Sequence, residues 1–454
     1  MVAFMQLSFS SQALTSETSN LIHGHAPHFT FDGGGTSVTN TDSLLGITLS
    51  NGTKYTPTTN NSFIKPIELP NLGETFANID MLVPTDTYSI NLSSLIAEPY
   101  NYFGDDDGDE NVTATGSLTL SIVDKNNQSV ARNAILDICK APYKLTLSNT
   151  DGALTTRYGF PNSNTFNASN TTYYINPKIS PKVCFAKPNL LYSSKVTNMG
   201  HFAGPPSIWD PENGFITQSF DSTTYGLNFP TTGADGLYFD LIIGGVAQPL
   251  KWEEVEREGI KADPSGTSVR VKLTGPVATE WESDSPDNIY NPSLPQTFEL
   301  VGRDSSDNEV IKYGFQLKQW FVNRGPKNYS YQQISWCEKI GYRITEVKDL
   351  TNAICPSNNY RCQGFVGATP SSSDGYYERN IGAGLFAEWG SMGDYNANFN
   401  DFQTSLWWYW TDEVLNQGND YDKNYRYIVS SRYGHVDLTM NYGGGGVNLV
   451  GISH

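Results

Sequence analysis

The amino-acid sequence predicts a mainly β protein, with immunoglobulin-like sandwich domains followed by an α+β domain at the C-terminal end. Aromatic residues make up 13% of the 454 residues, and glycine is abundant at 41 residues. Aromatic and β-branched residues suit pleated strands, while glycine, asparagine and aspartate suit tight turns. Segments with strand-like alternation recur along the chain, whereas the clearest helical spacing lies toward its C-terminal end.

Length and changes of pattern predict three domains after a short leader. We expect a sandwich at residues 14–134, a second β-rich domain at 135–319 and an α+β domain at 320–454. Residues 1–13 are mostly apolar or small and end in Ser-Gln-Ala. We interpret them as the end of a secretion signal that is cleaved after Ala13, which predicts an exported protein. The alternative is a plain, poorly ordered N-terminus.

Strand and turn signals justify the two β-rich domains. Residues 117–124 (SLTLSIVD) alternate apolar and polar side chains, as a half-buried strand does. Residues 50–53 (SNGT) carry the Asn-Gly pair that is typical of a hairpin. Residues 251–259 (KWEEVEREG) are the one short helix that we expect in this part of the chain.

Two helices are expected at the start of the α+β domain. In residues 330–340 the apolar side chains recur at spacings of three and four, and Ser330 can cap the first turn. A second helix is expected from Thr345, with Glu346 in its first turn. Its apolar face would comprise Val347, Leu350 and Ile354.

The five cysteines favour disulfide bonds if the protein is exported. We expect one bond between Cys139 and Cys184 and another between Cys355 and Cys362, which leaves Cys337 over. A zinc site is the alternative, but the sequence has no Cys-x-x-Cys pair.

Charge and motifs exclude several classes of function. The net charge of −18 makes nucleic acid and anionic membrane surfaces poor partners. The sequence contains no uninterrupted apolar run of about 18 residues, so it predicts no transmembrane helix. For catalysis, Gly-x-Ser-x-Gly is absent, His201 and His435 stand apart in the sequence, and Asp412 and Glu413 would point to opposite faces of a strand. We therefore predict that the protein is not an enzyme.

An acidic segment, residues 103–112 (FGDDDGDENV), is a candidate calcium site. Ca²⁺ takes several oxygen ligands from a flexible loop, although the EF-hand pattern is not met. A solvated acidic loop is the alternative. The histidines of residues 23–28 (HGHAPH) are interpreted as part of a linker rather than a metal site. The calcium ligands would be Asp105, Asp107, Asp109, Glu110 and Asn111.

Segments toward the C-terminus resemble a bacterial C-type-lectin-like module. They are SWCEKIGYRITEVKDLTNAI, GLFAEWG, LWWYWTDE and VSSRYGHVDLTMNY. Upstream segments such as DICKAPYKLTLSNTDGALTTRYGF and TYGLNFPTTGADGLYFDLIIGGV resemble a family of enterobacterial adhesins related to the tips of intimin and invasin. The resemblance covers residues 70–454 and implies a lectin-like fold for residues 320–454.

Two departures limit what the resemblance implies. Lectin-like modules usually keep a C-terminal cysteine that pairs with the position of Cys337, and this chain has none there, so we expect Cys337 to be a buried free thiol. The calcium-and-sugar signatures of true C-type lectins, such as Glu-Pro-Asn, are also absent. The resemblance therefore implies the fold and not calcium-dependent sugar binding.

Tyrosine-rich loops in the lectin-like region are the candidate ligand-binding surface, since tyrosine among small polar residues is typical of adaptable binding loops. In the run at 407–410 (WWYW), strand alternation and the lectin-like match predict Trp408 and Trp410 in the core. The alternative for the tyrosine-rich loops is that their tyrosines fill a small core and do not bind a ligand. The candidate ligand-binding residues are Tyr376, Tyr377, Trp389, Tyr395, Asn396, Asn398, Trp407, Tyr409 and Tyr433.

The resulting hypothesis is an exported bacterial surface adhesin of the outer membrane that takes part in host interaction and virulence. Its lectin-like module would bind a host cell-surface receptor, protein or glycan, without catalysis. The alternatives are a structural module that assembles other surface proteins and, as the catalytic option, a glycan-active hydrolase. The sequence does not indicate a partner that anchors the chain.

Overall fold

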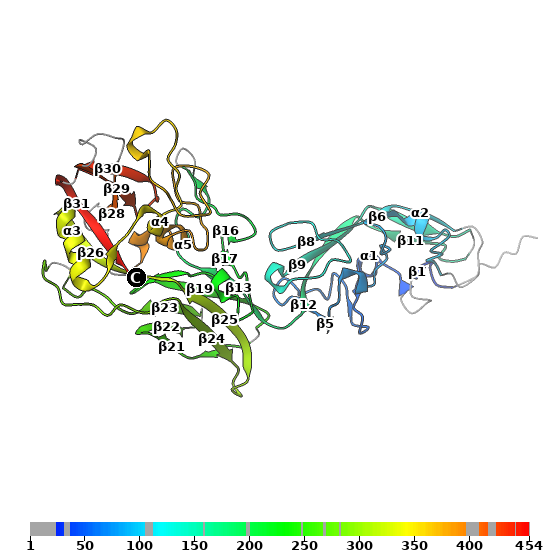
Figure 1. The fold of residues 1–454 in the computed structure, drawn as a ribbon. Helices are drawn as coiled ribbons and strands as arrows, with labels where there is room; N and C mark the ends of the chain where they lie inside the picture. The colour runs from blue at the N-terminus through cyan, green and yellow to red at the C-terminus, as the bar shows by residue number, and fades with distance from the viewer. Residues whose placement is uncertain are drawn as a thin grey trace, which may run out of the picture. The chain divides into compact units, whose positions relative to one another are not determined.

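The computed structural model describes residues 24–453 except for 31–36, 105–111, 158, 197–199, 247, 267–268, 281–282, 396–407, 416–423 and 441. The chain divides into two compact units, Met1–Ile179 and Ser180–His454. Strands supply most of the regular structure in both units, and the helices are few and short (Figure 1). The mainly β fold class predicted from the sequence is therefore confirmed.

The first unit is an immunoglobulin-like sandwich. A five-stranded sheet in the order β5-β12-β9-β8-β6 and a three-stranded sheet in the order β11-β10-β7 contribute to one hydrophobic core. Leu147 of the first sheet and Leu154 of the second are both buried in this core. The strands are β5 Ile67–Leu72, β6 Ser89–Asn91, β7 Thr113–Thr115, β8 Ser117–Val123, β9 Tyr143–Asn149, β10 Gly152–Thr155, β11 Ser163–Phe166 and β12 Ser169–Lys178.

Short elements complete the first unit. Strands β3 and β4 form the predicted hairpin, and Gly52 in the turn has a φ of 83°, which a glycine adopts without strain. The buried positions of β8 alternate along the strand as its sequence predicts. The short elements are β1 Phe29–Thr30, β2 Ser37–Val38, α1 Thr41–Leu44, β3 Ile47–Thr48, β4 Lys54–Tyr55, η1 Phe76–Asn78, α2 Leu92–Leu95 and η2 Ile138–Lys140.

The second unit contains two seven-stranded sheets, a three-stranded sheet and the two-stranded pair β14-β15. One seven-stranded sheet has the order β16-β17-β13-β19-β23-β22-β21, and a three-stranded sheet has the order β20-β24-β25. Their strands are β13 Lys182–Lys187, β16 Trp209–Asp210, β17 Gly214–Ile216, β19 Tyr238–Gly244, β20 Lys251–Trp252, β21 Val255–Arg257, β22 Ile260–Ser265, β23 Arg270–Thr274, β24 Gln296–Arg303 and β25 Glu309–Leu317.

The other large sheet has the order β18-β26-β31-β28-β29-β30, with β27 paired to β31. Helices α3 and α4 lie between β26 and β28 in the sequence, and β26 pairs with β31 at the end of the chain (Figure 1). Its strands are β18 Thr232–Ala234, β26 Gln319–Tyr329, β27 Arg343–Ile344, β28 Trp408–Val414, β29 Tyr425–Ser430, β30 Val436–Met440 and β31 Tyr442–Ile452. The remaining elements are β14 Lys195–Val196, β15 Gly200–His201, η3 Tyr225–Leu227, α3 Ser330–Ile340, α4 Val347–Leu350, η4 Tyr360–Cys362, α5 Leu385–Trp389 and η5 Met392–Asp394.

Of the three helices that the sequence predicts, one is confirmed, one is shorter than predicted and one is replaced by strands. Helix α3 covers Ser330–Ile340, as predicted. The second predicted helix is a single turn, α4, which ends before Ile354, a residue that is 40% exposed. Residues 251–259 form β20 and β21 instead of the predicted helix, because Val255–Arg257 pairs with β22 at a sheet edge.

The division into units differs from the domain boundaries expected from the sequence. The boundary at 134/135 would separate β8 from β9, although these strands pair over six positions. The boundary at 319/320 falls inside β26, and β26 pairs in parallel with β18 from the preceding segment. One hydrophobic core runs through residues 183–452.

The cysteines follow the predicted states. Cys355 and Cys362 are bonded to each other, with their Cα atoms 5.4 Å apart. Cys139 and Cys184 are both disulfide-bonded as well. Cys337 is a buried free cysteine on α3. Burial raises the pKa of its thiol, which keeps it protonated and inert at neutral pH.

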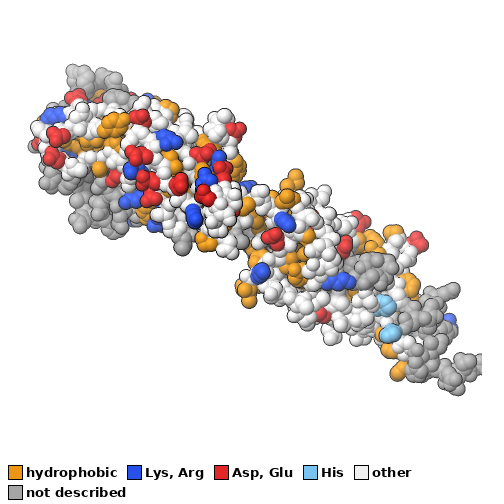
Figure 2. Space-filling view, turned by 90° about the horizontal axis from the view of Figure 1, so that it is seen from below, with side chains coloured by type: hydrophobic (Ala, Val, Ile, Leu, Met, Phe, Trp, Pro, Cys, Tyr) orange, Lys and Arg blue, Asp and Glu red, His pale blue; other side chains and the backbone are white. Residues whose placement is uncertain are grey.

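The surface is charged but mixed in sign. Figure 2 shows acidic and basic side chains next to one another on the visible face of the second unit. Ion pairs such as Arg270 with Asp240 and Lys261 with Glu254 belong to this unit. No helix among the described residues is long and apolar enough to cross a membrane.

Candidate binding surface

A cluster of half-buried aromatic side chains with one arginine forms the candidate site in the second unit. Three segments that are far apart in the sequence converge on it, together with the first residue of β28. We call this cluster the tyrosine–arginine surface, and it comprises Tyr192, Tyr376, Trp408, Arg432, Tyr433 and His435.

Arg432 joins two of the tyrosines. Its Nε donates a hydrogen bond to the Tyr192 hydroxyl at 3.0 Å, and that hydroxyl donates to the Tyr433 hydroxyl at 3.3 Å. The guanidinium carbon lies 5.7 Å from the Tyr192 ring centroid and 5.2 Å from that of Tyr433, which is within cation–π range. The two rings are 5.0 Å apart. The arginine is thus held in a fixed position between aromatic faces.

The other side of the surface is built around His435. Its ring centroid lies 4.7 Å from that of Trp408 and 5.9 Å from that of Tyr376, both in edge-to-face geometry. Tyr376 is in turn 6.3 Å from Tyr433. The rings therefore form one continuous surface rather than two separate patches.

Phe202 packs beneath the tyrosine–arginine surface, on its buried side. It is fully buried, and its ring contacts those of Tyr192, Tyr376 and Tyr433 at 5.3, 5.5 and 6.4 Å. Gly200 lets the Tyr376 ring approach the backbone, because a Cβ there would lie 2.4 Å from that ring.

Backbone hydrogen bonds lock the same loops together. The His201 amide donates to the Asp374 carboxylate at 2.9 Å, and the Arg379 amide donates to the Phe202 carbonyl at 2.9 Å. The rings are therefore held in place without a ligand, which reduces the entropy that binding would cost.

Burial shifts two titrating groups of the surface. It lowers the pKa of His435, although the charge of Asp437 acts in the opposite direction. Burial and the hydrogen bond with Tyr192 raise the pKa of Tyr433. Both shifts favour the uncharged forms of His435 and Tyr433, which lie near the Arg432 guanidinium.

The structure brings two of the predicted ligand-binding residues, Tyr376 and Tyr433, into this surface. Four others are corrected, because they lie in the core with at most 1% of their surface exposed: Tyr377, Trp389, Tyr395 and Tyr409.

Specific contacts explain why these four side chains are buried. Tyr377 packs on Phe202. Trp389 donates a hydrogen bond to the Thr232 carbonyl, and the Tyr395 hydroxyl donates to the Trp389 carbonyl. Tyr409 packs against Phe386 of α5.

The assignment of faces within β28 was correct for Trp410, which is buried in the core as predicted, and wrong for Trp408 and Tyr409. Trp408, which was expected in the core, is half-buried and belongs to the tyrosine–arginine surface, whereas Tyr409 and Trp410 are both fully buried. Strand β28 lies inside its sheet between β29 and β31, and α5 packs near Tyr409. Alternation cannot identify the solvent face of a strand that is covered on both sides.

Several predicted residues lie outside the described residues. They are Trp407, Asn396 and Asn398 of the ligand-binding set and all five calcium ligands, Asp105, Asp107, Asp109, Glu110 and Asn111. Within the described part of the chain, no group of three or more histidine, cysteine or carboxylate side chains could hold a metal ion. The calcium site therefore stays a prediction.

Sequence reasoning missed Tyr192, Arg432 and the role of His435. Tyr192 lies outside the lectin-like region, 240 residues before Arg432, so no local pattern connects them. His435 stands apart from other histidines, and its partners are aromatic rings. The available signal was the tyrosine-rich composition, which names residue types but not which loops meet.

The acidic pair after β28's aromatic run has a structural role. Asp412 is exposed and pairs with Arg426 at 3.3 Å, while Glu413 accepts a hydrogen bond at 2.9 Å from the Val347 amide at the start of α4. Burial raises the pKa of Glu413. The two carboxylates therefore support the fold separately and do not face one substrate.

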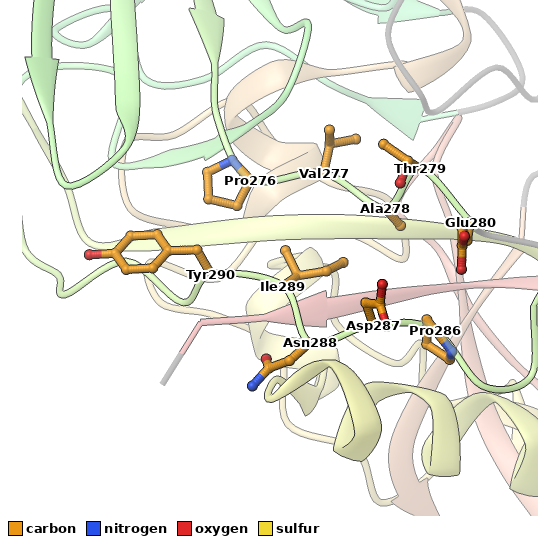
Figure 3. Close-up of a pocket in the computed structure, with 10 residues that line it drawn as sticks. All are labelled: Pro276, Val277, Ala278, Thr279, Glu280, Pro286, Asp287, Asn288, Ile289 and Tyr290. Atoms are coloured by element: carbon orange, nitrogen blue, oxygen red, sulfur yellow. The ribbon is translucent and has the colours of Figure 1, made fainter.

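The second unit also contains a cavity of about 260 Å³. Figure 3 shows its two lining stretches, 276–280 and 286–290, facing each other, with Ile289 directed between them. The same stretches are tied into the fold: the Pro276 carbonyl accepts from Trp320 Nε1, and the Tyr290 carbonyl accepts from the Tyr342 hydroxyl. We interpret the two lining stretches as structural segments that connect neighbouring strands, and not as a binding site.

Fold and surface together define a mainly β protein with a sandwich in its first unit and, in its second unit, sheets with short helices and an aromatic surface. No family model and no curated protein matches the chain.

Solved structures that the chain matches include those of invasin and intimin, the proteins that its sequence motifs resemble. The structure of invasin, a bacterial integrin-binding protein, is 12% identical with a TM-score of 0.34; the match covers 79% of this chain and 54% of that one, about half its length. A C-terminal 282-residue fragment of intimin, solved with the intimin-binding domain of the translocated intimin receptor, is 10% identical with a TM-score of 0.33 and coverages of 76% and 94%. An intimin mutant from EHEC O157:H7 is 11% identical with a TM-score of 0.28 and coverages of 49% and 88%.

Proposed function

We propose that the chain is an exported bacterial surface adhesin whose second unit binds a host cell-surface receptor through the tyrosine–arginine surface. The observation that carries the proposal is the convergence of three tyrosines, a tryptophan, a histidine and an arginine on one half-buried surface. Tyrosine, tryptophan and arginine are the residues that dominate binding energy at protein interfaces.

The chemistry of the surface supports recognition without catalysis. Large rings supply contact area with little loss of side-chain freedom, and the arginine adds directed hydrogen-bond donors. Its members are held by one another and by the buried Phe202, so they need little rearrangement on binding. A receptor protein with a complementary polar and apolar patch fits this surface. The acidic loop at 105–111 would add a structural calcium site, which remains a proposal from its sequence.

Binding of the full-length chain to cultured epithelial cells tests the proposal. We expect Tyr433→Ala and Tyr192→Ala each to weaken cell binding by about tenfold or more, because each removes a central aromatic contact. Tyr331→Ala is the matched control, since Tyr331 is a tyrosine of the same unit that is 58% exposed and lies on α3. Binding is measured by flow cytometry over a range of protein concentrations.

Two results would contradict the proposal. If the unaltered chain binds no host cell type, the adhesin proposal fails and the structural-module alternative gains support. If Tyr433→Ala and Tyr192→Ala bind as the unaltered chain does, the tyrosine–arginine surface is not the contact site. Equal melting temperatures for all variants are needed for either comparison.

A further inference from the structure

The first unit contains a pocket that the proposed adhesin function does not use. Its volume is about 510 Å³, which is within the roughly 300–1,000 Å³ of ordinary small-molecule sites. Every lining residue lies between Ile79 and Arg132, so the pocket belongs to the sandwich alone. Buried apolar side chains such as Met81 and Val83 border it, together with two tyrosines, two aspartates and one arginine.

Two tyrosine rings form a preformed aromatic wall. Tyr100 and Tyr102 are half-buried, and their ring centroids are 5.5 Å apart with an interplanar angle of 49°. Their backbone amides donate to the carbonyls of Ala97 and Leu95 at 3.0 and 2.7 Å, which fixes the turn that carries them. Rings in such positions can pack against the apolar C–H face of a ligand.

Two aspartates line the pocket. Asp80 and Asp86 are exposed, and the Tyr100 hydroxyl donates a hydrogen bond to Asp86 at 3.4 Å. The backbone of Asp80 is fixed by two hydrogen bonds with Thr48, at 2.8 and 2.9 Å. An ionised carboxylate has several acceptor positions, so each aspartate can accept hydrogen bonds from ligand hydroxyl groups.

Arg132 is the unusual residue of the pocket. It is only 4% exposed, and its Nη1 donates to the carbonyls of Val83 and Pro84 at 3.0 and 2.7 Å. Its Nε has no hydrogen-bond partner in the described part of the chain, and Arg132 takes part in none of the ion pairs found there. The charges of Asp86 and Asp80 in the same pocket favour the charged guanidinium, although they form no ion pair with it. A buried donor without an acceptor is costly, so the unpaired Nε beside a cavity suggests that a ligand supplies an acceptor.

The mixed charge of the pocket narrows the class of ligand. The guanidinium and the two carboxylates that line the pocket interact with one another, so the pocket needs no charged ligand to balance Arg132. The remaining chemistry is that of an uncharged molecule with hydroxyl donors, ether and hydroxyl acceptors, and an apolar face. A neutral sugar has all three properties.

We propose that this pocket of the first unit binds a neutral carbohydrate of one or two sugar units. One face of the sugar ring packs on Tyr100 and Tyr102, its hydroxyls donate to Asp80 and Asp86, and a ring or hydroxyl oxygen accepts from Arg132. The site is separate from the tyrosine–arginine surface and does not depend on the proposed receptor binding.

Saturation-transfer NMR on the full-length chain tests this site. The probes are the methyl glycosides of glucose, mannose, galactose and N-acetylglucosamine, each at millimolar concentration. We expect signal transfer to at least one glycoside, reduced about fivefold or more by Tyr100→Ala and by Asp86→Asn. The matched control is Tyr174→Ala, a half-buried tyrosine on β12 outside the pocket, which should keep the signal.

Folding and ligand charge are controlled separately. Asp86 is exposed, so Asp86→Asn tests the site without disturbing the core, and its melting temperature should equal that of the unaltered chain. The proposal is overturned if no glycoside receives signal, or if Tyr174→Ala reduces the signal as strongly as Asp86→Asn. Preferential binding of N-acetylneuraminic acid or choline in this assay would also overturn it, because the site would then select a charged ligand.

Discussion

His435 shows at the scale of a single residue how burial and binding chemistry meet. Its imidazole lies edge-on to Trp408 and near Tyr376, and its Nδ1 has no hydrogen-bond partner among the described residues. Protonation would place a positive charge there, with Asp437 as the nearby acidic group that favours it. Burial outweighs that attraction and keeps the pKa of His435 below its usual value.

The lowered pKa of His435 predicts a pH dependence of stability. The unfolded chain binds the proton more readily, so this contribution is fully present above about pH 6.5 and is lost as pH falls toward the folded-state pKa. We expect His435→Gln to lose less stability than the unaltered chain when the pH falls from about 7.5 to about 5.5, because the variant has no imidazole to protonate. Thermal unfolding at both pH values measures the difference. Equal losses would show that His435 does not titrate in this way.

For single residues, the sequence predicted which residue types form the candidate site, but it did not predict which residues contact one another there. Tyr376 and Tyr433 could be selected because tyrosines dominate the C-terminal loops. Their neighbour Tyr192 could not, since it reaches the surface from a loop far away in the sequence. Tyr409 was misassigned because burial on both faces of a strand removes the difference on which alternation depends.

At the scale of elements, local sequence patterns predicted the correct element where the intrinsic preference of the segment agrees with its tertiary packing. Helix α3 has the predicted bounds because capping and apolar spacing agree with its packing. Residues 251–259 were expected to be helical because glutamate, lysine and arginine favour helices. The same charged residues instead suit an edge strand: Lys261 of β22 pairs with Glu254 and Glu256 at 3.0 and 3.3 Å.

Glu388 is the side chain that docks helix α5 on strand β18. Its fully buried carboxylate accepts hydrogen bonds from the amides and hydroxyls of Thr231 and Thr232 and from the Gly382 amide, at 2.6–3.1 Å. We expect Glu388→Ala to lower the free energy of unfolding by about 3–5 kcal/mol, because buried donors would lose their acceptor.

Guanidinium unfolding followed by tryptophan fluorescence measures this loss in the relevant unit, since all nine tryptophans of the sequence lie after residue 180. Glu338→Ala, at an exposed position of α3, is the matched control and should change stability little. A loss for Glu388→Ala no larger than that of the control would show that the carboxylate does not hold α5 in place.

At the scale of the whole molecule, the sequence predicts the fold class but not where the chain divides. Changes of local pattern placed a boundary at 319/320, where β structure gives way to helices. Non-local pairing crosses that boundary, because Gly233 of β18 lies opposite Trp320 of β26. Composition and periodicity report local structure and contain no record of such pairs.

Residues 320–454 should therefore not fold by themselves. Residues 320–454 would lose Phe229, whose ring lies 4.8 Å from that of Trp389, and the Asn189 carbonyl, which accepts from the buried Arg379 at 2.7 Å. They would also lose the threonines that satisfy Glu388. We expect a fragment of residues 320–454 to lack a cooperative unfolding transition, whereas residues 180–454 with Cys184→Ser should keep one.

Thermal unfolding and the tryptophan emission of both fragments measure this difference. Since buried tryptophans such as Trp389 and Trp410 report packing, the shorter fragment should show the emission of exposed indoles. Cooperative unfolding with buried-type emission in residues 320–454 would contradict the prediction and restore the boundary that the sequence suggests. If the prediction holds, receptor binding must be measured on residues 180–454 or the full chain, because only these keep Tyr192 beside Arg432 and Tyr433.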